Sequence, residues 1–230
     1  MHDFFASSVY FGVFISLAAY FAGLYLRKKT ELSILNPLLA SIVLIMALLM
    51  ACNIPYDAYY ASAKVLSTLL TPATICLAVP LYEQLELLRR HKKAILLGVL
   101  SGVITSLICV FVLSLLFGLD HAAYVTLLPK SITTAIGMGV SEKLGGHVSI
   151  TVAVILLTGI LGNMTAKTVC RLCSITDPVA RGVAIGTSSH AIGTTHAMEM
   201  GEIEGAMSGL SIVIAGVLTV AGATLFAPLI

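Results

Sequence analysis

The chain has 230 residues, of which 58% are hydrophobic and only 10% charged, and its formal net charge is +2. A soluble domain carries about 25% charged residues, so this composition excludes an ordinary soluble protein. No basic run or aromatic platform favours nucleic acid as a partner. At about 20 residues per helical span, the length predicts an integral membrane protein with roughly seven or eight segments.

The apolar stretches are continuous, which favours an all-α membrane protein over a barrel of alternating strands. The expected segments are 4–26, 35–52, 62–88, 94–117, 122–145, 148–170, 176–200 and 205–229. We expect them to form one transmembrane domain, 1–230. The first basic cluster, Arg27 to Lys29, follows the first apolar stretch instead of preceding it, which predicts a retained helix and not a cleaved signal peptide.

The basic residues predict the orientation, because cytoplasmic loops collect lysine and arginine. The clusters after the first and third segments are both cytoplasmic if the N-terminus lies outside. A full span at 122–145 would then place Lys167, Arg171 and Arg181 outside, against the rule. A re-entrant or broken segment there places all three in the cytoplasm and leaves only Lys143 on the wrong side.

The composition of the fifth segment favours the broken form. Pro129 should interrupt a helix. The residues that follow it are poor lipid-facing side chains: Lys130, Ser131, Thr133 and Thr134. We therefore expect 122–145 to be re-entrant or broken.

This topology predicts two three-helix units of inverted orientation, 35–117 and 148–229. The middle helix of each is interrupted, near Pro72 in the first unit and near Gly186 and Gly193 in the second. Corresponding interrupted segments in two halves indicate the binding site of a transporter. We expect an inverted 3+3 repeat core with discontinuous helices and a cavity between the breaks.

The polar residues beside the breaks are the candidate substrate-binding residues. Backbone groups freed inside a membrane must line protein or a wet cavity, and the N-terminus of a half-helix suits an anion. The candidates are Thr71, Thr74, Lys130, Ser131, Thr133, Thr134, Ser188, Ser189, His190 and Thr194, with helix breaks at Pro72, Pro129, Gly186 and Gly193. Structural alternatives stay open for most of them: kinked-helix threonines, a packing histidine, and a lysine that snorkels or pairs.

Other polar and small residues favour structural roles. Asp177 and Arg181 are expected to start a helix with an ion pair, and Glu199, Glu202 and Glu204 to form a solvated face. Glycines four residues apart permit close helix packing: Gly98 and Gly102, Gly182 and Gly186, and Gly201, Gly205 and Gly209. The five cysteines are expected to be small buried hydrophobes. Cys170 and Cys173 form half of a redox or metal motif with no second pair, so no metal or cofactor is expected.

Catalysis is not expected either. His190 and His196 lie about 120° apart on a continuous helix and would not chelate one metal. No H-E-x-x-H or G-x-S-x-G motif occurs.

Four ordered stretches resemble the LrgB/CidB family from about Asn36 to the C-terminus. They are NPLLASIVLIMALL, LLTPATICLAVPLYEQ, LLPKSITTAIGMGVSEKLGG and ITDPVARGVAIGTSSHAIGTTHAMEMGEIEGAMSGL. The resemblance implies a multi-pass protein of the bacterial inner membrane, encoded beside a holin-like LrgA/CidA partner and linked to murein hydrolase export and lysis. It also implies kinship with plastid glycolate/glycerate exchangers, and with the cation/proton antiporter and bile-acid symporter fold.

Together these features predict a transporter of small organic anions such as glycolate, glycerate, pyruvate or lactate, with H⁺ or Na⁺ as candidate coupling ion and a homo-oligomeric assembly. In that hypothesis Lys130 supplies positive charge and His190 carries a coupling proton. The alternative is a holin/antiholin-type regulator of murein hydrolase export that acts with an LrgA/CidA-like protein. A third is a scaffold with purely structural breaks.

Overall fold

The computed structural model describes residues 10–30, 37–69, 72, 76, 82 and 85–230. Every regular element within these residues is a helix, as the sequence predicts. The chain divides into two compact units, Met1–Cys76 and Leu77–Ile230. The candidate binding residues Thr71 and Thr74 lie outside the described residues, and Pro72, the predicted helix break between them, is exposed.

The first unit is a small group of helices built on α2. Its helices are α2 (Phe11–Thr30), α3 (Pro37–Ala51), α4 (Tyr56–Ala63) and α5 (Val65–Thr68). Helix α2 packs against both α3 and α4. Gly12 lets α2 approach α4 so closely that its backbone N–H donates to Ser62 Oγ at 2.8 Å. Gly23 plays the same part toward α3, because a Cβ there would lie 2.6 Å from the Pro37 carbonyl oxygen.

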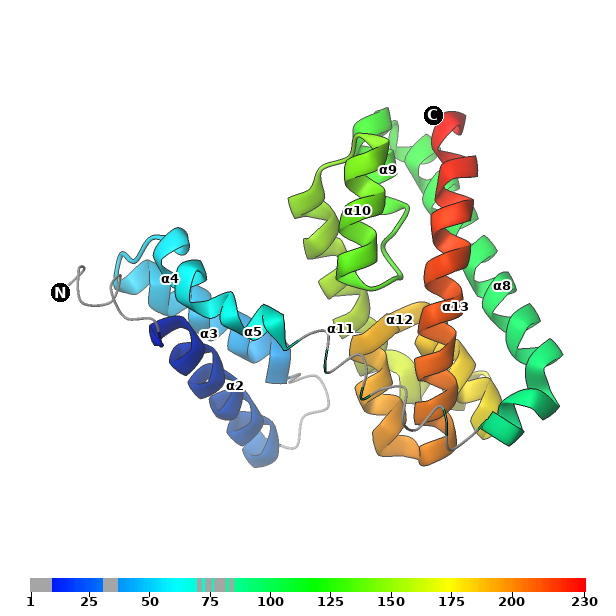
Figure 1. Ribbon diagram of the computed structural model, residues 1–230, viewed down its shortest axis with the longest axis horizontal. Helices are drawn as coiled ribbons and strands as arrows, with labels where there is room; N and C mark the ends of the chain where they lie inside the picture. The colour runs from blue at the N-terminus through cyan, green and yellow to red at the C-terminus, as the bar shows by residue number, and fades with distance from the viewer. Residues whose placement is uncertain (1–9, 31–36, 70–71, 73–75, 77–81, 83–84) are drawn as a thin grey trace. The chain divides into compact units, whose positions relative to one another are not determined.

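The second unit is a bundle in which α12 and α13 make the most extensive pairing (Figure 1). Its elements are α8 (Leu85–Phe117), α9 (His121–Leu127), α10 (Thr134–Leu144), α11 (Val148–Leu172), α12 (Pro178–Met200), α13 (Glu202–Phe226) and the 3₁₀ turn η1 (Ala227–Leu229). Helix α12 also packs on α11 and α8, and α13 lies along α8. Helix α12 is therefore central to this unit.

One apolar stripe of α8 forms much of the core of this unit. Ile95, Val99, Val103 and Leu107 recur every fourth residue and are all buried. Residues four apart lie on one face of a helix, so this spacing turns a single stripe inward. The stripe belongs to the same buried cluster as Tyr124 of α9 and Met207 and Ala215 of α13.

Glycines allow the helices of the second unit to pack closely, as the spacing motifs predict. A Cβ on Gly102 of α8 would lie 2.6 Å from Thr187 Cγ2, and one on Gly182 of α12 would lie 2.5 Å from the Glu204 carbonyl oxygen. Close packing of this kind matters in a membrane, where lipid removes the hydrophobic drive between helices.

Three helices of the described chain are long and apolar enough to cross a membrane: Arg89–Phe117, Val148–Leu172 and Glu202–Leu229. A shorter apolar helix is Pro37–Ala51. The expectation of about seven or eight membrane segments, one of them re-entrant or broken, stays a prediction beyond these three spans. The fifth predicted segment is divided into helices of 7 and 11 residues. The inverted repeat, with units 35–117 and 148–229, stays a prediction.

Several charged and sulfur-containing residues differ from expectation. Asp177 caps α12, accepting from the Ala180 N–H at 2.9 Å as predicted, but Arg181 pairs with Glu204 at 3.9 Å instead of with Asp177. Glu204 is only 6% exposed, so its assignment to a solvated face is wrong. Cys170 is buried, but the other cysteines are exposed on the chain surface, contrary to prediction: Cys52, Cys76, Cys109 and Cys173.

Candidate functional site

Helix α12 is interrupted at His190. This residue has φ 41° and ψ −142°, so two helical stretches meet there instead of one continuous rod. The sequence places the unwinding at Gly186 and Gly193, but both serve close packing instead. A Cβ on Gly186 would collide with the carbonyl of Ser208, and one on Gly193 with the Cβ of Ser189. Positive φ is uncommon for a residue other than glycine, so packing must hold His190 in place.

The surroundings of His190 are tightly packed and polar. The side chain is 2% exposed, its Nδ1 contacts the Ser189 carbonyl oxygen, and Gly159 of α11 leaves room for its ring. Thr194 Oγ1 donates to the His190 carbonyl at 3.1 Å and lies 2.7 Å from Ser208 Oγ of α13. The interruption is thus enclosed by α11, α12 and α13.

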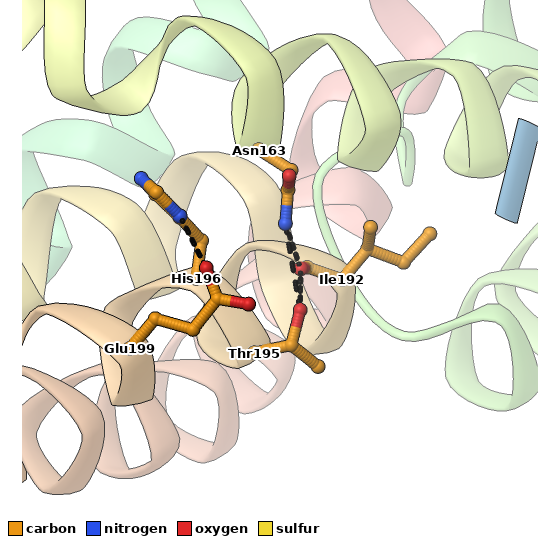
Figure 2. Close-up of polar contacts among 5 residues, drawn as sticks. All are labelled: Asn163, Ile192, Thr195, His196 and Glu199. Atoms are coloured by element: carbon orange, nitrogen blue, oxygen red, sulfur yellow. Dashed lines mark hydrogen bonds and ion pairs between the residues drawn. The ribbon is translucent and has the colours of Figure 1, made fainter. Parts of the chain in front are cut away.

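Asn163 of α11 contacts α12 just after the interruption (Figure 2). Its Nδ2 donates to the Ile192 carbonyl oxygen at 2.8 Å and reaches Thr195 Oγ1 at 3.4 Å. One turn further on, His196 Nδ1 lies 3.3 Å from Glu199 Oε2, a contact also drawn in Figure 2. Sequence reasoning missed Asn163, although an amide in an apolar helix is a signal that can be recognised.

The hydroxyl residues before the interruption divide between two environments. Ser188 is exposed and donates back to the Ala184 carbonyl at 2.7 Å, while Ser189 is buried. The two serine hydroxyls lie 3.0 Å apart. Within the described residues the buried Thr187 Oγ1 has no hydrogen-bond partner. Of the predicted residues on α12, the structure therefore groups Ser189, His190 and Thr194.

The fifth predicted segment is broken where the sequence indicates. Helix α9 ends at Leu127, α10 begins at Thr134 after the N-cap residue Thr133, and the buried Pro129 lies between them. Lys130 is half-buried and donates to Ser131 Oγ at 3.0 Å. Ser131 Oγ in turn lies 3.3 Å from Ser106 Oγ of α8. This connection joins the break to α8.

Lys130 has no acidic partner within ion-pair distance among the residues that the structure describes. Its ammonium group donates to the neutral Ser131 hydroxyl. A half-buried cation without a carboxylate is costly unless a ligand, solvent or lipid headgroup balances it.

A buried hydroxyl network ties together α9, α10 and α11, and sequence reasoning missed it. Thr151 of α11 is fully buried, and its Oγ1 lies 2.7 Å from Ser141 Oγ and 3.0 Å from the Thr126 carbonyl oxygen. Thr126 Oγ1 accepts from the His147 backbone N–H at 2.7 Å. The network fixes how the broken segment returns into α11.

Several hollows are lined by described residues of the second unit, and three of them bear on the site. One of about 270 Å³ lies beside α8 and the start of α12, one of about 350 Å³ at the end of α11, and one of about 260 Å³ between α10 and α13. None of these three is lined by His190 or Lys130. The substrate-binding role of the candidate residues stays a prediction.

Comparison with known proteins identifies the family. The model of the LrgB-like family matches residues 16–229, almost the whole chain. The chain belongs to the LrgB-like family. This confirms the resemblance of the four sequence motifs, and together with the long apolar helices it makes the chain a membrane protein.

Individual LrgB relatives align over nearly their full length. The antiholin-like protein LrgB of Bacillus cereus (strain B4264) is 35% identical over 222 residues, which cover 96% of this chain and 96% of the relative. The antiholin-like protein LrgB of Bacillus anthracis (strain A0248) shows the same identity and coverage. No solved structure matches the chain significantly.

Proposed function

We propose that this chain is an antiholin-type membrane component that acts with a holin-like LrgA/CidA partner to control murein hydrolase export and cell lysis. The observation that carries this proposal is the match to relatives named antiholin-like protein LrgB over 96% of both chains. In this proposal the chain lies in the bacterial inner membrane, crosses it several times and forms a homo-oligomer. The exposed apolar faces of α8, α11 and α13 are suited to lipid or to other membrane helices.

Co-expression tests this proposal. The tagged full chain is produced with its LrgA/CidA-type partner and purified in mild detergent, and murein hydrolase activity is measured in the culture medium. We expect the partner to co-purify and the secreted hydrolase activity to change when the chain is present. An unrelated multi-pass protein of similar size is the control. Loss of the partner during purification, together with unchanged hydrolase release, would contradict the proposal.

A second candidate function, transport of a small organic anion, is favoured by Lys130. This half-buried cation lacks an acidic partner among the described residues and lies at a helix break. A carboxylate of glycolate, glycerate, pyruvate or lactate would supply the missing charge, and the neighbouring Ser131 hydroxyl would orient it. The interruption at His190 adds a second polar element, with H⁺ or Na⁺ as the candidate coupling ion.

Uptake into liposomes separates the two candidates. If the chain is a carrier, purified protein takes up labelled short carboxylates saturably, and Lys130→Ala abolishes the uptake. Lys143→Ala is the matched control, because Lys143 is exposed near the end of α10. Leak of unrelated solutes that is insensitive to Lys130→Ala would support a pore-like role instead. Liposomes that take up no more carboxylate than protein-free ones would exclude the carrier.

A further inference from the structure

A basic hollow lies where α11 ends and α12 begins. It has a volume of about 350 Å³, and its polar lining comprises Lys167, Arg171, Ser174, Thr176 and Arg181. Met200, the last residue of α12, also lines it. Three cationic side chains and two hydroxyl groups therefore surround one recess that is separate from both helix breaks.

The positive charge of the basic hollow is only partly balanced. Arg181 is held in place: its Nε donates to the Ile175 carbonyl oxygen at 2.8 Å, and its guanidinium lies 3.9 Å from the buried Glu204 carboxylate. Neither Lys167 nor Arg171 has an acidic partner within ion-pair distance in the part of the chain that the structure describes. Two cations are thus left for an external anion.

The helix N-terminus is not the origin of this site. The Asp177 carboxylate already accepts the Ala180 N–H and caps α12. The attraction for an anion therefore comes from side chains. A planar guanidinium donates two parallel hydrogen bonds to phosphate oxygens, and lysine adds a compact charge.

Exposed apolar side chains lie in the same last turns of α11 as the basic residues of the hollow. Val169 and Leu172, which flank Arg171, are 47% and 78% exposed. They end one of the helices long enough to cross a membrane. A cationic recess at the end of a span that also exposes apolar side chains matches the charge and apolar pattern of an anionic lipid.

We propose that the basic hollow binds a phosphate group, carried either by the headgroup of an acidic phospholipid or by a soluble phosphate. Arg171 and Lys167 contact the phosphate oxygens, while Arg181 lines the recess from α12. This proposal is independent of both functions proposed above, because it rests neither on the match to antiholin-like relatives nor on Lys130 and His190.

Native mass spectrometry of the purified full chain tests the proposal. The detergent-solubilised protein is titrated with phosphatidylglycerol or phosphatidylcholine, and in a separate arm with sodium phosphate against sodium chloride at equal ionic strength. We expect phosphatidylglycerol to bind roughly tenfold more tightly than phosphatidylcholine, and the double variant Lys167→Gln/Arg171→Gln to lose this preference. Binding of inorganic phosphate with the same dependence on the two residues supports the site with a soluble ligand.

The matched control is Lys92→Gln/Lys93→Gln, which removes two exposed charges of α8 on the same predicted side of the membrane. It should retain the full preference. The proposal is overturned if both double variants lose the preference for phosphatidylglycerol equally, or if the Lys167/Arg171 variant binds like the unmodified chain. It is also overturned if the chain prefers neither phosphatidylglycerol over phosphatidylcholine nor phosphate over chloride. Both target side chains are exposed, and size-exclusion elution checks folding. If the double variant elutes as aggregate, the single substitutions give the same comparison.

Discussion

Gly186 sets the distance between α12 and α13. A Cβ built on this residue would collide with the carbonyl oxygen of Ser208 and lie 2.8 Å from its Cα. These atoms belong to backbone, which cannot rotate away as a side-chain end can. The hydrogen bond between Thr194 and Ser208, near the interruption at His190, depends on the same helix pairing. Position 186 must therefore be a glycine for α12 and α13 to pack as closely as they do, and this pairing is the most extensive helix contact in the unit.

Gly186→Ala should therefore destabilise the protein. Forcing one methyl group into a packed interface costs about 1–3 kcal/mol, which a lowered thermal midpoint in detergent will detect. Gly139→Ala is the control, because a Cβ at this exposed position of α10 meets no atom within 4 Å. Alanine is favoured over glycine in a helix by about 1 kcal/mol, so the control should be neutral or slightly more stable. Equal losses in the two variants would show that close packing at Gly186 is not the cause.

At the scale of residues, local patterns were predictable and tertiary partners were not. The cap at Asp177 follows from its position before Pro178, and the glycine spacing indicated close packing. Glu204 was assigned to a solvated face because two acidic residues lie near it in sequence. Its burial depends on Arg181, which comes from another helix. No pattern within α13 contains that information.

Among the elements, buried hydroxyl groups hold α9 and α10 in position beside α11. Thr151 is 0% exposed, and its hydroxyl has three acceptors within reach: Ser141 Oγ and the carbonyl oxygens of Thr126 and His147. A buried polar atom that loses its partner keeps the cost of having left water. The network should accordingly stabilise the packing of α9 and α10 on the long helix α11.

Thr151→Val tests this network while nearly preserving side-chain volume. We expect a loss of about 1–3 kcal/mol in stability and faster amide hydrogen exchange in α9 and α10. Thr151→Ser retains the hydroxyl and should keep most of the network. Thr165→Val on the same helix is the matched control, because this exposed hydroxyl only donates back to the Leu161 carbonyl. The network has no stabilising role if Thr151→Val and Thr165→Val behave alike.

The two helix interruptions differ in how far the sequence predicted them. Pro129 marks the break between α9 and α10 because proline lacks an N–H and restricts the residue before it. The interruption in α12 lies at His190, although Gly186 and Gly193 are the residues with backbone freedom. Packing against Gly159 of α11 and Ser208 of α13 decides its position. Such contacts between distant residues leave no local signature.

For the whole molecule, composition was enough to predict an all-helical membrane protein, and four motifs were enough to identify its family. Of the predicted membrane segments, three are long, apolar helices among the described residues, and the predicted break in the fifth is present between α9 and α10. The side of the membrane on which each loop after residue 145 lies depends on whether 122–145 crosses completely. If it does not, Lys167, Arg171 and Arg181 all face the cytoplasm. The basic hollow would then face the leaflet that is rich in anionic lipid.

Two exposed cysteines test this topology directly. Cys52 follows α3, and Cys173 follows α11; both are accessible at the chain surface. In variants that retain one of these cysteines and carry serine at the other four, a membrane-impermeant maleimide added to intact cells should label Cys52. Cys173 should react only after the cells are permeabilised, because a broken segment at 122–145 leaves the end of α11 in the cytoplasm. Labelling of Cys173 in intact cells, with Cys52 also reactive, would mean that 122–145 crosses the membrane.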